Sequence, residues 1–385
     1  MKKSCIALAM FAAIAAQAAP YVPANGQQVI ETLPRRGDPV QQELRRLRSQ
    51  LNAAPNDLAL ATTLARRYIA IGRDETDPRY LGYAQAVLAP WWWLSAPPPQ
   101  VRLLRATLLQ STHHFQPALE DLKAVLAADP GNAQAWLTRA TVQTVQGDYS
   151  SATSSCARLS TLSTELVTVT CIANIGAVTG RALKSEQLLD LTLERSSNAP
   201  ADLQLWALTL LAEMAQRRDD KAVAEARYKR ALSMAPRDSY LLGAYADFLL
   251  EQNRPREVVR MLNDQTRIDA LLLRRALALQ HMGSSATADV TELAARFDAA
   301  TQRGDTVHQR EQARFELKLR KDAVAALSLA RKNWEVQKEP ADIRIYLEAA
   351  LQARDSAKPV VDWVALNRTE DAAAMRLIAR LRAGS

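Results

Sequence analysis

Histidines and cysteines are the side chains here most able to carry catalysis or bind a metal, and their spacing favours neither. The four histidines are His113, His114, His281 and His308, and none of them stands in an HExxH or another metal-ligand spacing. The sequence also lacks GxSxG, P-loop and GxGxxG motifs. We therefore predict a protein that is not an enzyme and that holds neither a cofactor nor a metal.

Cys156 and Cys171 are the cysteines that remain when Cys5, which falls in the export signal described below, is set aside. Their spacing is not CxxC, which disfavours redox catalysis. An even number of cysteines in an oxidising compartment favours a disulfide. Two buried thiols that never meet are the alternative.

Trp91, Trp92 and Trp93 stand together between Pro90 and three prolines at 97–99. Consecutive residues cannot all face one side of a helix, so at least one indole should be partly exposed. The tryptophans could form an aromatic platform for a sugar ring or a proline-rich strand. They could instead be a hydrophobic plug between two packing units, which is the interpretation we favour.

Residues 1–18 have the pattern of a cleaved bacterial export signal. Two lysines are followed by an apolar run, and Ala16 and Ala18 supply small residues before a cut that we place after Ala18. The run is too short for a membrane-spanning helix, which needs about 20 residues. We therefore predict a periplasmic protein with no transmembrane segment after cleavage.

Composition favours an all-α fold. The 385 residues are 48% apolar and include only 12 glycines, which disfavours sandwiches, barrels and doubly wound sheets. Alanine, leucine and arginine, all good helix formers, are abundant. The net charge is +8, or +6 without Lys2 and Lys3. A basic exported chain favours anionic envelope partners such as an acidic glycan, and we expect no nucleic acid.

A helix, a turn and a second helix recur along the chain. In one copy, Pro130 precedes Trp136 and Ala140 on a first helix, Gly147 begins the turn, and Ala152 lies on the second helix. This pattern resembles the tetratricopeptide repeat, a helix–turn–helix unit of about 34 residues. The small residues of successive first helices are roughly 36 residues apart on average; they are Ala65, Ala106, Ala140, Ala173, Ala212, Ala246, Ala276, Ala313 and Ala350. The second-helix positions are Ala84, Ala118, Ala152, Ser185, Ala224, Val258 and Ala325.

The resemblance implies an α-solenoid of stacked antiparallel helix pairs wound into a right-handed superhelix. We expect a flexible leader at 19–38 and eight or nine helix pairs over 39–366, with an N-terminal capping helix at 40–53. A C-terminal capping helix should lie within 367–385.

The repeat also places the two cysteines on neighbouring antiparallel helices. Cys156 falls on the second helix of the third unit and Cys171 on the first helix of the fourth, with the turn near Ser163. Residues equidistant from such a turn face each other. We therefore predict a Cys156–Cys171 disulfide, which the chain-entropy model values at about 3 kcal/mol.

In tetratricopeptide proteins the first helices line a concave face that usually holds an extended peptide or a partner helix. The densest charged cluster expected there joins Arg310, Glu311 and Arg314 to Arg344 and Glu348 of the next unit. Such residues ordinarily form solvated pairs along a helix. In the functional interpretation, the arginines bind a carboxylate-bearing partner. The basic residues of the family's carboxylate clamp are not in register.

The resemblance therefore implies a non-catalytic periplasmic scaffold or adaptor that binds an envelope protein or peptide on its concave face. The alternative is a glycan- or polymer-binding component of envelope assembly or export, which the tryptophans and the positive charge favour.

Overall fold

The computed structural model describes residues 25, 27, 37–305 and 307–384. The predicted export signal at 1–18, with its cut after Ala18, lies outside the described residues, as does most of the predicted leader at 19–38. Over the described residues every regular element is a helix. None of the described helices is both long enough and apolar enough to span a membrane.

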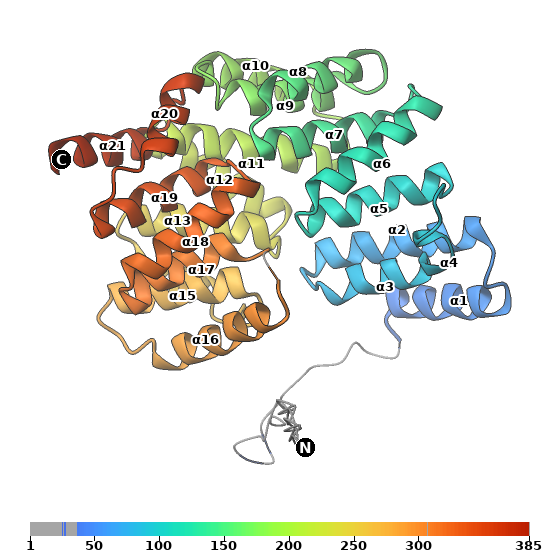
Figure 1. Ribbon diagram of the computed structural model, residues 1–385, viewed down its shortest axis with the longest axis horizontal. Helices are drawn as coiled ribbons and strands as arrows, with labels where there is room; N and C mark the ends of the chain where they lie inside the picture. Colours follow the sequence, from blue (N-terminus) through green and yellow to red (C-terminus); the bar gives the residue numbers. More distant parts are fainter. Residues whose placement is uncertain (1–24, 26, 28–36, 306, 385) are drawn as a thin grey trace, which may run out of the picture.

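Antiparallel helix pairs make up most of the chain, as Figure 1 shows. The first helices of the pairs are α2 (Leu58–Asp74), α5 (Pro99–Ser111), α7 (Ala133–Gln146), α9 (Glu165–Gly176), α11 (Ala201–Arg217), α13 (Ser239–Glu251), α15 (Asp269–His281), α17 (Gln309–Phe315) and α19 (Pro340–Ala353). The second helices are α3 (Arg79–Val87), α6 (Phe115–Ala128), α8 (Tyr149–Ala157), α10 (Ala182–Arg195), α12 (Lys221–Met234), α14 (Pro255–Met261), α16 (Thr287–Gln302), α18 (Ala323–Val336) and α20 (Lys358–Asn367). Outside the pairs lie α1 (Pro39–Ala53), α4 (Ala89–Trp92), the 3-10 turn η1 (Arg158–Thr161), the π-turn η2 (Glu316–Arg320) and α21 (Ala372–Gly384).

Short polar side chains start many of these helices. Asn132 accepts a hydrogen bond from the Ala135 amide at 3.0 Å, which supplies an acceptor that the first turn of α7 otherwise lacks. Asp148 does the same for α8 by accepting from the Ser151 amide at 3.1 Å. Between them Gly147 ends α7 with φ +79°, a left-handed conformation that glycine adopts without strain. These residues fix the tight turn of the third pair.

Small side chains lie where neighbouring helices touch. All nine predicted first-helix alanines, from Ala65 to Ala350, are buried, none more than 1% exposed. Helix backbones approach to about 8–10 Å only where the intervening side chains allow it, so this burial confirms the predicted repeat. One second-helix position is wrong by a residue, because Ala326 is fully buried whereas Ala325 is half-buried. The π-turn η2 before α18 holds more residues per turn than an α-helix, which accounts for the shift.

Caps close the two ends of the array. Helix α1 packs on α2 through Leu44, Leu47 and Leu51 at the predicted N-terminal cap. Helix α21 occupies the predicted C-terminal cap and packs on α19 through Ala374 and Ile378. Helix α1 thus covers apolar surface of the first pair, and α21 covers that of the last pair, which water would otherwise contact.

The array turns back on itself. Figure 1 shows α19–α21 lying beside the turns of the third and fourth pairs. The Lys338 amide donates to the Val145 carbonyl at 2.7 Å, and the Glu370 carboxylate accepts from the Ala182 amide, also at 2.7 Å. Lower down, the hydroxyls of Thr76 and Ser239 form a hydrogen bond between the first and sixth pairs. The concave face is therefore enclosed by the chain itself.

Candidate functional site

The inner face, by which we mean the concave surface formed by the first helices of the pairs, gathers charged side chains from distant hairpins. Arg310, Glu311 and Arg314 stand on α17, and Arg344 and Glu348 on α19, as the helical spacing requires. Across from them, α13 contributes Asp247 and Glu251. The structure therefore brings the predicted cluster together and adds carboxylates from two pairs earlier.

Arg314 is bound to Asp247 of the sixth pair. Its Nη1 lies 2.7 Å from Asp247 Oδ1, while Arg274 Nη2 lies 2.6 Å from Oδ2 of the same carboxylate. Burial opposes ionisation of Asp247, but the charges of Arg274 and Arg314 outweigh it and lower its pKa. Asp247 is thus held as a carboxylate between two guanidinium groups.

Arg310 and Arg344 also have carboxylate partners. Arg310 Nη1 lies 2.9 Å from Glu339 Oε2 and 3.4 Å from Asp342 Oδ1, and its Nε lies 3.5 Å from Glu311 Oε1. Arg344 Nη1 lies 2.8 Å from Glu251 Oε1, and its Nη2 lies 2.9 Å from Asp371 Oδ2. Most of these pairs join different helices rather than neighbouring turns of one helix.

Glu348, by contrast, pairs with a lysine, as its Oε2 lies 2.7 Å from Lys318 Nζ.

Glu213 and Tyr240 are inner-face residues of a different kind. The Tyr240 hydroxyl donates to Glu213 Oε1 at 2.6 Å, although 63% of Tyr240 is exposed. Burial among the inner-face helices raises the pKa of Glu213, and the Glu213 charge raises the pKa of Tyr240. A large, exposed aromatic ring therefore projects into a surface otherwise dominated by ion pairs.

Arg217 lies one helical turn after Glu213 on α11 and is nine-tenths buried. Among the described residues, its Nη2 is a buried polar side-chain atom that lacks a hydrogen-bond partner. Arg217 and Trp363 both belong to the surroundings of Tyr149, whose ring centroid lies 6.0 Å from that of Trp363. Burial raises the pKa of Tyr149 to about 12, an effect that a hydrogen bond with Trp363 and the charge of Arg217 partly offset.

The three consecutive tryptophans have different environments. Trp92 is 6% exposed and belongs to the core formed by α1–α5, Trp91 packs partly against that core, and Trp93 is 84% exposed. Beside Trp93 lies a shallow pocket of about 270 Å³ whose other walls are small or uncharged, among them Gly82, Gln85 and Ala86. Trp92 is therefore buried as a hydrophobic plug requires, and Trp93 is the exposed member of the triplet.

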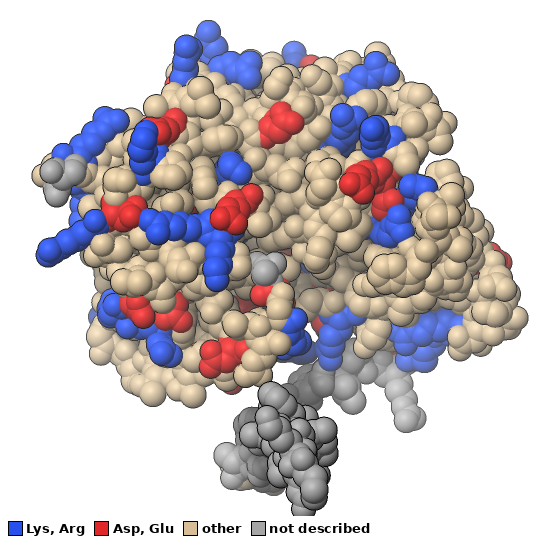
Figure 2. All heavy atoms as spheres, in the orientation of Figure 1, with Lys and Arg blue, Asp and Glu red and all other residues tan. Residues whose placement is uncertain are grey.

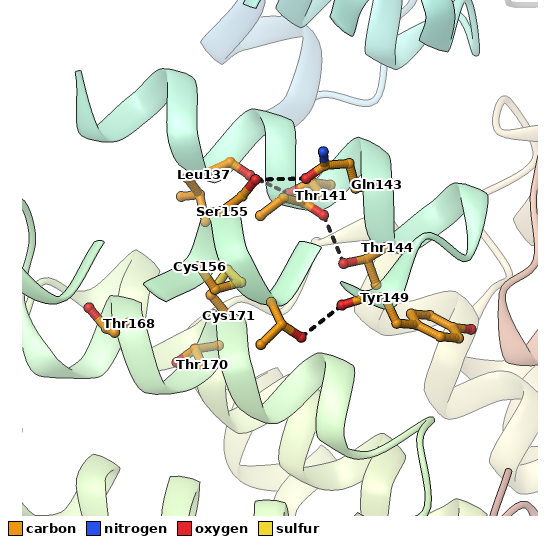
Figure 3. Close-up of a disulfide and its surroundings, with 12 residues drawn as sticks. Leu137, Thr141, Gln143, Thr144, Tyr149, Ser155, Cys156, Thr168, Thr170 and Cys171 are labelled. Carbon is orange, nitrogen blue, oxygen red and sulfur yellow. Dashed lines mark hydrogen bonds between the residues drawn. A yellow bond between two sulfur atoms is a disulfide. The ribbon is translucent and has the colours of Figure 1, made fainter. Parts of the chain in front are cut away.

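Cys156 and Cys171 form a disulfide, with their Cα atoms 5.7 Å apart. Figure 3 shows it between α8 and α9, surrounded by threonine and serine side chains. The turn between the helices falls at residues 162–164, next to the expected position. Both cysteines are buried with Ala152 and Ile175, so the bond joins the third pair to the fourth inside a shared core.

No group of three or more His, Cys, Asp or Glu within the described ranges could hold a metal ion. His114 is exposed at the α5–α6 turn, whereas the adjoining His113 is half-buried with φ +58°. Burial and the nearby Arg310 charge lower the pKa of His113. His308 is the residue before α17, where its side chain makes no capping hydrogen bond.

Charged residues of both signs are present on the face drawn in Figure 2, and in its middle they lie side by side. Tyr240, Glu339 and Asp371 were not predicted, because they belong to the inner face only through contacts between hairpins that lie far apart in the sequence. Glu213, Arg217 and Asp247 were accessible to sequence reasoning, since each follows a repeat alanine at a spacing that faces inward.

The sequence matches no protein-family model and no curated protein. The structure is similar to a human IFIT1 dimer with PPP-AAAA, at 14% identity and a TM-score of 0.45 over 89% of this chain and 86% of that one. It is also similar to a tetratricopeptide repeat protein from Parabacteroides merdae, at 13% identity and a TM-score of 0.36 over 80% of this chain and 99% of that one. A third similar structure is the P58(IPK) TPR domain, at 12% identity and a TM-score of 0.22 over 82% and 94% of the two chains. The helix pairs described above and their buried alanines at the predicted repeat spacing make the fold an α-solenoid of the tetratricopeptide type.

Proposed function

We propose that the protein is a non-catalytic scaffold that binds a segment of a partner protein on its inner face. The observation that carries this proposal is the convergence of partly exposed arginines and carboxylates from α13, α17 and α19 on one enclosed surface. Arg310, Glu311, Arg314, Arg344 and Glu348 are its proposed contact residues.

The arginines can bind a partner without first losing their internal carboxylates. A guanidinium carries five N–H donors, and the pair with Asp247 uses one donor of Arg314. A quarter of the Arg314 side chain and 27% of the Arg310 side chain remain exposed. A partner carboxylate would therefore add to an existing network, which arginine supports through its planar, multidentate geometry.

The proposal is tested by replacing Arg310 and Arg314 together by alanine. The folded chain should tolerate the change, because Asp247 keeps Arg274 and Asp342 keeps the Asn333 amide at 2.8 Å. Partner capture should fall while helical circular dichroism stays the same. A matched control replaces Arg331 and Lys358, which stand on second helices and form exposed ion pairs, and should leave capture unchanged.

The partner for this assay is obtained by site-specific photo-crosslinking in cells. A photoreactive residue at Tyr240 should give an adduct, whereas one at the similarly exposed Val324 on α18 should not. The identified partner is then purified and its affinity for both double variants measured. Equal affinity for the Arg310/Arg314 variant and the unmodified protein would place the site elsewhere.

We further propose that the protein acts in the periplasm after removal of residues 1–18. The buried disulfide supports this location, because such bonds persist in oxidising compartments. N-terminal sequencing of protein released from the periplasm should begin at Ala19. A first residue of Met1 in that fraction would contradict cleavage.

A second candidate function, binding of an envelope glycan, is favoured by Trp93. Its exposed indole beside an uncharged pocket offers the apolar surface on which a sugar ring stacks. Titration with an acidic polysaccharide should change the tryptophan fluorescence of the unmodified protein but not of Trp93→Ala. An identical response from both proteins would remove the support for this candidate.

A further inference from the structure

The seam between the two arms of the superhelix differs in kind from the contacts between neighbouring hairpins. Helices α19–α21 meet the turns of the third and fourth pairs at this seam, through the hydrogen bonds from Lys338 to Val145 and from Ala182 to Glu370. Thr369 Oγ1 adds a bond to the Val178 carbonyl at 3.4 Å. We call α19–α21 the clasp.

Apolar cores hold neighbouring hairpins together but do not cross this seam. The core that contains the clasp runs from Ala313 to Ile378, and none of its described members comes from α1–α15. The other clusters likewise join consecutive helices along the chain. Since burial of apolar surface is the main stabilising contribution between packed elements, the seam is weaker than the joints between neighbouring hairpins.

A large aromatic side chain crosses the seam. The Trp363 indole rests on Gly147, where a Cβ atom would lie 2.5 Å from Cζ2 and 2.6 Å from Cη2 of the ring. The Lys338 ammonium lies 5.7 Å from the centroid of the same ring. Only glycine leaves room for this contact, so the closed arrangement depends on residue 147.

An unsatisfied donor also lies beside the seam. Arg217 Nη2 is buried without an acceptor among the described residues, near Tyr149 at the start of α8. Burying a polar donor without an acceptor costs free energy, because the donor loses its hydrogen bonds to water. Closure therefore carries a penalty that opening relieves by hydrating the Arg217 donor.

We propose that the clasp opens as a unit while the hairpins stay folded, so that the protein exchanges between a closed ring and an open superhelix. In the open form α19–α21 leave the turns at 145–149 and 178–182, and the inner face beside Arg217 becomes accessible. The hairpins on either side keep their own cores throughout. This opening requires no partner and would gate access to the inner face in the function proposed above.

Amide hydrogen exchange on the unmodified protein provides the first test. The Lys338 and Ala182 amides donate hydrogen bonds across the seam, so their exchange reports on the seam. The neighbouring Asp148 amide donates to the Gln143 carbonyl within its own hairpin at 2.8 Å, so its exchange does not. The two seam amides should exchange at least about tenfold faster than core amides of α11, and without global unfolding. Exchange of Lys338 and Ala182 only at the rate of global unfolding would overturn the proposal.

A pair of glycine variants provides the second test. Gly147→Ala places a methyl group into the Trp363 ring, whereas Gly283→Ala, at a similar φ of +69°, meets nothing within 4 Å. The left-handed backbone strain is common to both, so the difference isolates the clasp. Small-angle scattering should show a larger radius of gyration for Gly147→Ala alone, with helical circular dichroism unchanged. An unchanged radius for folded Gly147→Ala would refute opening at the clasp, and if that variant does not fold the exchange measurement still decides.

Discussion

Reduction of the Cys156–Cys171 bond should destabilise the junction between the third and fourth pairs. The bond closes a loop with a sequence separation of 15 residues, for which the chain-entropy model gives about 3 kcal/mol. Neither cysteine is more than 6% exposed, so the reduced thiols would stay packed in the same core. Loss of the cross-link, rather than loss of packing, would therefore account for the change.

The assay is urea unfolding of the oxidised protein, the reduced protein and a Cys156→Ala/Cys171→Ala variant. Reduction should lower the free energy of unfolding by about 3 kcal/mol, and the variant should fall slightly further because it also loses the two sulfur atoms from the core. Hydrogen exchange should show the loss concentrated in α8 and α9.

Two observations would refute this reasoning. The first is an equal unfolding midpoint with and without reductant. The second is a count of two free thiols in the oxidised protein after denaturation, which would mean that the buried cysteines never pair.

Three further predictions concern the packing, the tryptophans and a buried carboxyl group. Ala246→Leu, at a fully buried helix contact, should cost about 1–3 kcal/mol in unfolding free energy by overpacking, whereas Ala226→Leu on an exposed face should change it by less than about 0.5 kcal/mol. Trp92→Ala should cost about 3–5 kcal/mol, and Trp93→Ala less than about 0.5 kcal/mol; equal costs would contradict their opposite exposures. Burial raises the pKa of Asp342 from 3.8 to about 6, so protonation stabilises the folded state, and this stabilisation is lost as the pH rises through about 6. The difference in urea midpoint between the unmodified protein and Asp342→Asn should therefore shift in favour of the variant as the pH rises from about 4 to about 7, and a pH-independent difference would exclude the raised pKa.

The repeat could be predicted from the sequence because each hairpin leaves a local record. Ala140 and Ala152 are small because their own helices touch, and Asn132 and Gly147 mark the ends of a single helix. Every one of these constraints acts over fewer than about 34 residues, the length of one unit. The disulfide follows from the same local geometry, since its cysteines flank one turn.

The contacts across the inner face could not be predicted from the sequence in this way. The helical period puts Arg314 and Asp247 on the same concave surface, but it does not say that the superhelix is tight enough for them to meet. Likewise nothing near Trp363 in the sequence indicates that its ring rests on Gly147. Curvature accumulates from small rotations at every hairpin, so a modest difference per repeat separates an open ribbon from a closed ring.

The closed arrangement of the array changes how the charged residues of the inner face would bind a partner. In an open solenoid, Arg314 and Arg344 would face water, and an anionic partner would gain little by displacing their solvent. In the closed array both already hold carboxylates of α13, so the inner face is organised before a partner arrives. Organised charges lose less conformational freedom on binding than free ones do, which favours affinity. The same enclosure restricts the entry of a partner to the inner face. The contacts that close the array therefore both organise the charged residues and determine when a partner can reach them.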